Sequence, residues 1–267
     1  MVDSNLAIGV FDSGVGGLTV VRELARALPE EPIVYLGDTA RVPYGTKSSA
    51  TVTRYALACA SILQERGIKI LVVACNTASA HGLGALRAAL DIPVIGVVEP
   101  GAHAAAAATR SGRIGVIGTR GTVSSGAYPE AIQRCAAAAK VFAAPCPLFV
   151  PLAEEAWLEG PVPLAAAQNY LGPLLENGID TLVLGCTHYP LLKETIAHVT
   201  GPAVTLVDSA EETARTVGQT LDAMGGRCTR TFLPQYRFLV SDDPDSFARV
   251  GALFLGRPLD TVEWVDF

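Results

Sequence analysis

The chain lacks the features that mark several common classes of protein. No apolar run approaches the ~20 residues that a membrane-spanning helix needs. The opening segment, "MVDSNLAIGVFDSG", has no basic stretch ahead of an apolar one, so a secretory signal is not expected either. The net charge is −6 at pH 7, which argues against a general nucleic-acid binder because such proteins usually carry a basic surface.

Motifs for several kinds of chemistry are also missing. The glycine loop "DSGVGGLTV" at 12–20 lacks the last glycine of G-x-G-x-x-G and the Walker lysine, which disfavours a nucleotide site. There is no G-x-S-x-G for acyl transfer. Six cysteines are widely spread and form no C-x-x-C pair: Cys59, Cys75, Cys135, Cys146, Cys186 and Cys228. This pattern favours reduced thiols in the cytoplasm over a disulfide framework, and no recurrent Cys/His spacing indicates zinc.

Short β-rich runs do alternate with Ala- and Leu-rich helical stretches along the chain, which predicts an α/β fold with mostly parallel sheets flanked by helices. The first half has predicted strands at 7–11, 33–37, 69–74 and 93–98. The second half has them at 113–118, 140–144, 181–185 and 203–207. Each strand follows its counterpart by about 110 residues, which suggests a duplication, although chance agreement between α/β strands would look similar.

The duplication predicts two similar domains related by a pseudo-twofold axis, with the active site in the cleft between them. After the second copy, the pattern predicts a helix, a strand, a helix and a strand, at 207–226, 235–242, 245–255 and 261–267. We expect this tail to pack back on the first copy. The first domain would then be discontinuous, and the two domains would comprise residues 1–99 plus 208–267, and residues 100–207.

Two apolar runs end in the same way: "LVVACNTASA" at 71–80 on Cys75, and "LVLGCTHYPLL" at 182–192 on Cys186. A single buried cysteine is more often a packing residue, but two at matched positions of a duplicated unit favour function. Ligands bind beyond the carboxyl ends of parallel strands. Each cysteine precedes residues that can begin a helix, whose dipole favours a thiolate.

Two facing domains would place the thiols on opposite sides of a cleft. Stereoinversion at a carbon needs this arrangement, because one group removes a proton and another delivers one to the opposite face. A redox dithiol is an alternative, although its cysteines normally lie close in sequence. Asp12, at the end of the first strand, suits a substrate ammonium group or equally well a helix N-cap.

Five segments together closely resemble the glutamate racemases of the cofactor-independent aspartate/glutamate racemase superfamily: "FDSGVGGLTV", "GDTARVPYG", "ACNTAS", "CPLFVPLAEE" and "GCTHYPLL". They occur in the family's order across nearly the whole chain. The resemblance implies interconversion of L- and D-glutamate for bacterial peptidoglycan synthesis, in the cytoplasm, without pyridoxal phosphate, metal or other cofactor. It also implies a homodimer with a two-domain α/β fold.

Carried over position by position, the resemblance makes Cys75 the base that takes a proton from the D-enantiomer and Cys186 the base for the L-enantiomer. Asp12 and His188 are expected to assist these two thiols. Glu154 matches an acidic residue near the second thiol, although Glu155 adjoins it. The implied substrate contacts are Asp12, Ser13, Tyr44, Gly45, Asn76, Thr77, Thr187 and His188.

Other interpretations differ in substrate or in chemistry. An aspartate or broad-specificity racemase of the same superfamily would share the site, and a non-catalytic amino-acid-binding or thiol-regulated protein could use the same scaffold. A Schiff-base enzyme has little support, because the chain has four lysines and only Lys47 is expected in a strand-end loop. The remaining four cysteines are expected to be packing residues or incidental.

Overall fold

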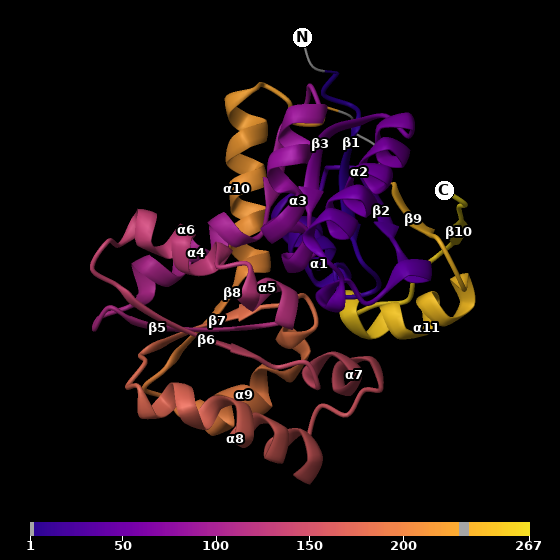
Figure 1. Ribbon diagram of the computed structural model, residues 1–267. Helices are drawn as coiled ribbons and strands as arrows, with labels where there is room; N and C mark the ends of the chain where they lie inside the picture. The colour runs from indigo at the N-terminus through magenta and orange to yellow at the C-terminus, as the bar shows by residue number, and fades with distance from the viewer. Residues whose placement is uncertain (1–2, 230–234) are drawn as a thin grey trace.

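The computed structural model describes residues 3–229 and 235–267, and its strands form two parallel sheets (Figure 1). The first sheet has the spatial order β10 (Val262–Trp264), β9 (Tyr236–Val240), β2 (Ile33–Gly37), β1 (Ala7–Asp12), β3 (Ile68–Val73) and β4 (Val94–Gly96). The second has the order β6 (Lys140–Pro145), β5 (Arg113–Gly118), β7 (Thr181–Gly185) and β8 (Thr205–Asp208). The predicted α/β class is confirmed.

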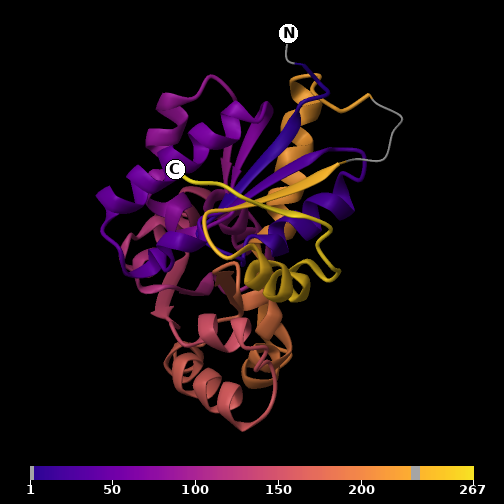
Figure 2. The same cartoon turned by 90° about the vertical axis from the view of Figure 1, so that its right-hand side faces the viewer.

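The two sheets repeat one strand order. In the first sheet β1 lies between β2 and β3, with β4 beyond β3, and in the second β5 lies between β6 and β7, with β8 beyond β7. This correspondence agrees with the predicted duplication. The tail strands β9 and β10 extend the first sheet next to β2, as Figure 2 shows from the side.

The predicted domain limits stay a prediction. The first falls inside helix α4 (Val98–Ala108), which connects the two sheets, and the second falls where β8 gives way to α10 (Ser209–Ala223). The chain thus passes between the sheets through two helices that pack on each other.

Helices cover both faces of each sheet because neighbouring strand residues point to opposite sides. In β1, Ile8 and Val10 pack in one cluster with α1 (Leu18–Ala27), α10 and α11 (Pro244–Leu255). Phe11 packs in the other, with α2 (Ser49–Glu65) and α3 (Asn76–Ala89). The second sheet lies between α4 and α6 (Ala127–Cys135) on one face, and α7 (Phe149–Glu154), α8 (Pro161–Glu176) and α9 (Lys193–Thr200) on the other.

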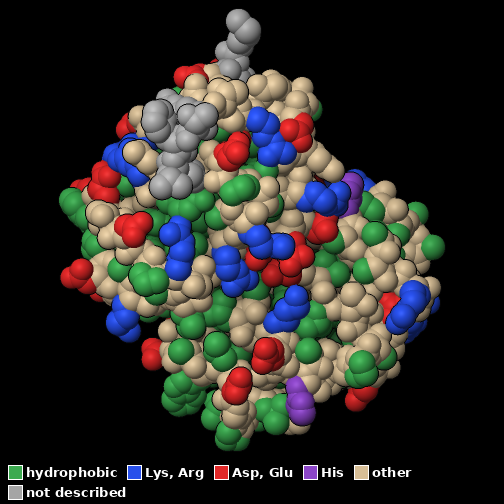
Figure 3. Space-filling model, turned by 180° about the vertical axis from the view of Figure 1, so that it is seen from behind, with side chains coloured by type: hydrophobic (Ala, Val, Ile, Leu, Met, Phe, Trp, Pro, Cys, Tyr) green, Lys and Arg blue, Asp and Glu red, His purple; other side chains and the backbone are tan. Residues whose placement is uncertain are grey.

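The surface carries charges of both signs. Acidic and basic side chains are interspersed over the face shown in Figure 3. In the part of the chain that the structure describes, no helix has both the length and the apolar character needed to cross a bilayer.

A buried ion pair joins separate segments at the amino ends of strands in the first sheet. Nζ of Lys69, on β3, lies 2.6 Å from Oε2 of Glu31, and both side chains are buried. Lys69 also donates to the carbonyl of Ser4, and Oε1 of Glu31 accepts from the backbone N–H of Cys228. Since an unpaired charge in the interior is costly, each partner stabilises the fold only while the other is present.

Replacing Glu31 with Gln should therefore lower the free energy of unfolding by ~3–5 kcal/mol, because it leaves the Lys69 ammonium buried without a counter-charge. Urea unfolding measures this loss. The control Glu263→Gln breaks exposed ion pairs with Arg66 and Arg237 and should cost less than ~1 kcal/mol. Equal losses in the two variants would contradict the role given to the buried pair.

Candidate active site

Cys75 caps a helix at the carboxyl end of the first sheet. It follows β3 and is the N-cap of α3, where its Sγ accepts from the backbone N–H of Ala78 at 3.5 Å. The thiol also lies 3.6 Å from the hydroxyl of Ser13, in the loop after β1. The predicted position at a helix N-terminus is confirmed.

The helix acts on the Cys75 thiol in the predicted direction, but burial outweighs its effect on the pKa. Burial raises the pKa of Cys75 to about 12, and the carboxylate of Asp12 and the nearby Cys186 also raise it. The hydrogen bonds with Ala78 and Ser13 act in the opposite direction but are outweighed. Cys75 is therefore a protonated thiol at neutral pH. It lies close enough to Cys186 for a charge there to raise its pKa.

Cys186 occupies the matching position in the second sheet, directly after β7, but its surroundings differ. Its Sγ lies 3.8 Å from Nδ1 of His188. The helix expected to begin after Cys186 is first a short 3₁₀ turn, η3 (Tyr189–Leu192), with Pro190 near its start, and α9 follows. The side-chain partner of this thiol is therefore an imidazole.

His188 connects Cys186 to an acidic residue. Its Nε2 lies 3.0 Å from Oε1 of Glu154, the last residue of α7, so the structure selects Glu154 over Glu155 as the partner. Burial alone would lower the pKa of His188, but hydrogen bonds to Cys186 and Glu154 and the negative charges of these groups raise it to about 10. His188 is therefore an imidazolium at neutral pH, held between Cys186 and Glu154.

Asp12 lies between the two motifs. It is fully buried at the end of β1, where Oδ2 accepts from the N–H of Gly14 at 3.0 Å and Oδ1 accepts from the hydroxyl of Thr187 at 3.4 Å. The N-cap of α1 is Gly17, so Asp12 does not cap that helix. Burial raises the pKa of Asp12, whereas the positive charge of His188 lowers it.

The glycine loop after β1 packs directly on the second motif. A Cβ on Gly16 would lie 2.5 Å from Nδ1 of His188 and would also overlap the hydroxyl of Thr187. Thr19 lies in the first turn of α1, directly after this loop, and its hydroxyl donates to the carbonyl of Thr187 at 3.1 Å. Gly16 therefore allows the loop after β1 to approach Thr187 and His188 closely.

Three threonine hydroxyl groups meet at a second contact between the two sheet units, where α3 approaches α5. Oγ1 of Thr77, on α3, lies 2.9 Å from that of Thr119 and 3.1 Å from that of Thr122, at the start of α5 (Arg120–Ser124). Sequence reasoning missed Thr119 and Thr122. The available signal was their position after β5, which corresponds to that of Asp12 and Ser13 after β1.

The other expected contact residues have mixed surroundings. Tyr44, in the short helix η2 (Tyr44–Thr46), is buried, and its hydroxyl donates to the carboxylate of Asp38. The backbone of Gly45 is so close to Thr119 that a Cβ would lie 2.7 Å from the threonine Cβ. Asn76 is buried beside Cys75, and its Oδ1 accepts from Tyr128.

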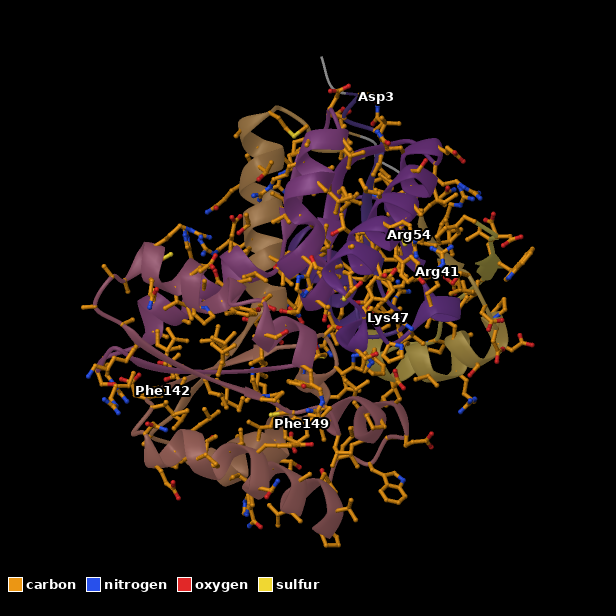
Figure 4. The ribbon with its side chains drawn as sticks, in the orientation of Figure 1. Asp3, Arg41, Lys47, Arg54, Phe142 and Phe149 are labelled. Carbon is orange, nitrogen blue, oxygen red and sulfur yellow. The ribbon has the colours of Figure 1, made fainter. Side chains whose placement is uncertain are left out.

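Basic residues lie near η2, the short helix that contains Tyr44 and Gly45. Figure 4 shows Lys47 with Arg41 and Arg54 near η2 and the start of α2, whereas Phe142 and Phe149 lie on the second sheet unit.

Among residues 3–229 and 235–267, no group of three or more His, Cys, Asp or Glu side chains is arranged to hold a metal ion. A surface groove of about 1140 Å³ between α4, α6 and α10 is lined by Cys135 and by neither site thiol. The predicted cleft around both thiols stays a prediction.

Comparisons with known proteins agree with this arrangement. Residues 8–217 match the model of the Asp/Glu/Hydantoin racemase family. A glutamate racemase of Geobacter metallireducens is 59% identical over 262 residues, covering 97% of this chain and 96% of the relative. Crystal structures of glutamate racemases from Bacillus anthracis and, in complex with D-glutamate, from Francisella tularensis each match with a TM-score of 0.93, at 41% and 39% identity. Both matches cover 98% of this chain and 98% of the other.

The fold and these relatives define an α/β enzyme of the isomerase class. Its two thiols lie at equivalent strand ends, with a carboxylate and an imidazolium beside them. The chain belongs to the Asp/Glu/Hydantoin racemase family. The resemblance seen in the five sequence segments is thereby confirmed.

Replacing Glu154 with Gln should lower the pKa of His188 from about 10, because the variant removes a negative partner. NMR titration of the histidine ring signals measures this pKa. The raised pKa stabilises the fold fully below about pH 6.5, and this contribution is lost as the pH rises through about 10. The stability deficit of the variant should therefore be largest below about pH 6.5 and shrink towards pH 10. The exposed neighbour provides a control, Glu155→Gln, and an equal shift in both variants would contradict the pairing.

Proposed function

We propose that this protein interconverts L- and D-glutamate through proton transfers by Cys75 and Cys186. The observation that carries the proposal is the matched position of the two thiols after β3 and β7, equivalent strands of the two sheets. It is supported by relatives named glutamate racemase, one of them solved with D-glutamate bound.

The two thiols have different neighbours: burial and the carboxylate of Asp12 raise the pKa of Cys75, whereas Cys186 lies beside the imidazole of His188. This difference suits Cys75 to donate a proton and Cys186 to accept one. The Cys186 thiolate, paired with the His188 imidazolium, removes the α-proton of L-glutamate. The Cys75 thiol delivers its own proton to the opposite face of the carbon, giving D-glutamate. Cys186 is then the thiol and Cys75 the thiolate, which is the state required for the reverse reaction.

The charges around the thiols also suit an amino acid. The buried carboxylate of Asp12 can accept the substrate ammonium group, whose positive charge would lower the pKa of Cys75. The hydroxyls of Thr77, Thr119 and Thr122 can donate to a carboxylate. The positive end of the α3 dipole, at Cys75, stabilises negative charge that develops on the substrate. These groups act without an electron-sink cofactor.

The proposal extends to the biological setting that the sequence resemblance implies. The D-glutamate would serve as a precursor of peptidoglycan, the reaction would take place in the cytoplasm, and the enzyme would act as a homodimer. Rescue of a bacterium that requires external D-glutamate tests the first point, and sedimentation of the purified protein tests the last.

The proposed activity is tested by polarimetry of the purified protein with each enantiomer of glutamate and aspartate. Both glutamate enantiomers should converge on the same mixture, with kcat/KM for aspartate at least about tenfold lower, a difference typical of one missing methylene. Preference for aspartate would support the alternative racemase. Glutamate binding without turnover would instead support a binding protein on this scaffold.

Cys75→Ala and Cys186→Ala should each lower kcat by at least ~10²–10⁴-fold, because each removes one of the two proton carriers. Circular dichroism should show that both variants remain folded. The matched controls are the alanine variants of the four other cysteines, Cys59, Cys135, Cys146 and Cys228, which should keep most of the activity. Near-normal turnover in either active-site variant would remove that cysteine from the mechanism.

A further inference from the structure

Tyr128 is a buried residue of the second sheet and its covering helices, and it hydrogen-bonds to Asn76, the residue after Cys75. It lies on α6 and is 1% exposed, and its hydroxyl donates to Oδ1 of Asn76 at 2.7 Å. Asn76 directly follows Cys75 and begins α3. One side chain thus bridges elements that belong to different sheets.

The ring of Tyr128 also packs beside Gly185, the residue before the second thiol. A Cβ on Gly185, the residue before Cys186, would lie 3.0 Å from Cε2 of the tyrosine. A Cβ on Gly101 would lie 3.3 Å from the tyrosine hydroxyl and 3.0 Å from Cβ of Ser209. Gly101 and Ser209 lie on α4 and α10, the helices through which the chain passes between the sheets. Tyr128 therefore contacts both strand ends and the junction between the two sheet units.

The amide of Asn76 has one free group. Among the buried side-chain atoms of the described residues, Nδ2 of Asn76 has no hydrogen-bond partner. The bond from Tyr128 occupies Oδ1 and so fixes which end of the amide remains available as a donor. A buried donor without a partner is rare in folded proteins unless a ligand or water completes it. A substrate carboxylate oxygen, which can only accept, has the matching chemistry.

We infer that Tyr128 is a positioning residue that holds the Asn76 amide with Nδ2 directed to a substrate carboxylate and keeps the ends of β3 and β7 at a fixed separation. This inference rests on the proposed function, because glutamate is the carboxylate concerned. Tyr128 acts through Asn76 and transfers no proton itself. Its loss should therefore weaken substrate binding more than it slows the chemical step.

A double-mutant cycle on the full-length protein tests the inference. Tyr128→Phe should raise KM for glutamate about tenfold while kcat changes less than about twofold, because one hydrogen bond that orients the amide is lost. Asn76→Ala should raise KM by about tenfold to 100-fold. The double variant should match Asn76→Ala within about twofold, because Tyr128 has no amide left to orient. The control is Tyr170→Phe on α8. It removes a hydroxyl that accepts from the backbone N–H of Leu148, and it should leave KM unchanged.

Several results would overturn the inference: an unchanged KM in Tyr128→Phe, a fall in kcat alone, or single effects that multiply in the double variant. Calorimetric titration with an equilibrated mixture of the two enantiomers gives Kd for the same proteins and does not depend on turnover. If the unmodified protein binds glutamate without racemising it, the proposed function fails while the Kd values still decide the role of Tyr128. If the unmodified protein does not bind glutamate, both are overturned.

Discussion

The close contact between the glycine loop after β1 and the segment Thr187–His188 is the constraint on which the site depends. Gly16 leaves no space for a Cβ there, and Thr19 and Asp12 both hydrogen-bond to Thr187. This contact brings the carboxyl ends of two different sheets together and buries Cys75 and Cys186 within electrostatic reach of each other. Without it, each thiol would be an ordinary buried cysteine at the end of a strand.

The duplicated scaffold supplies matched positions, but the loops give the two thiols opposite electrostatic surroundings. Cys75 is close to the carboxylate of Asp12 and is held as a thiol, whereas Cys186 is next to an imidazolium that is itself paired with Glu154. In the proposed mechanism this difference suits one thiol to donate a proton and the other to accept one, which is the combination that inversion of a carbon centre requires.

Much of the fold could be predicted because strand and helix periodicity are local properties of the chain. The eight duplicated strands, the tail strands and the capping position of Cys75 were all visible in the order of residues. The raised pKa of Cys75 was not, because it results from burial by segments distant in sequence and this burial outweighs the helix dipole. Thr119, Thr122 and Tyr128 were missed for a related reason: only the meeting of the two sheets brings them to Thr77 and Asn76. The short 3₁₀ turn after Cys186 reflects tertiary packing of Tyr189, which is fully buried.

The central claim is that two different thiols serve the two faces of the substrate carbon. The most direct test follows pure L-glutamate in D₂O, with the isotope at the α-carbon measured by mass spectrometry in each enantiomer. In the proposed mechanism Cys186 removes the original proton and Cys75 supplies a deuteron from solvent. Deuterium should therefore appear in the D-product before it appears in the remaining L-substrate. An early D-product rich in protium would show that a single base returns the original proton, and it would contradict the paired-thiol mechanism even if both cysteines were essential.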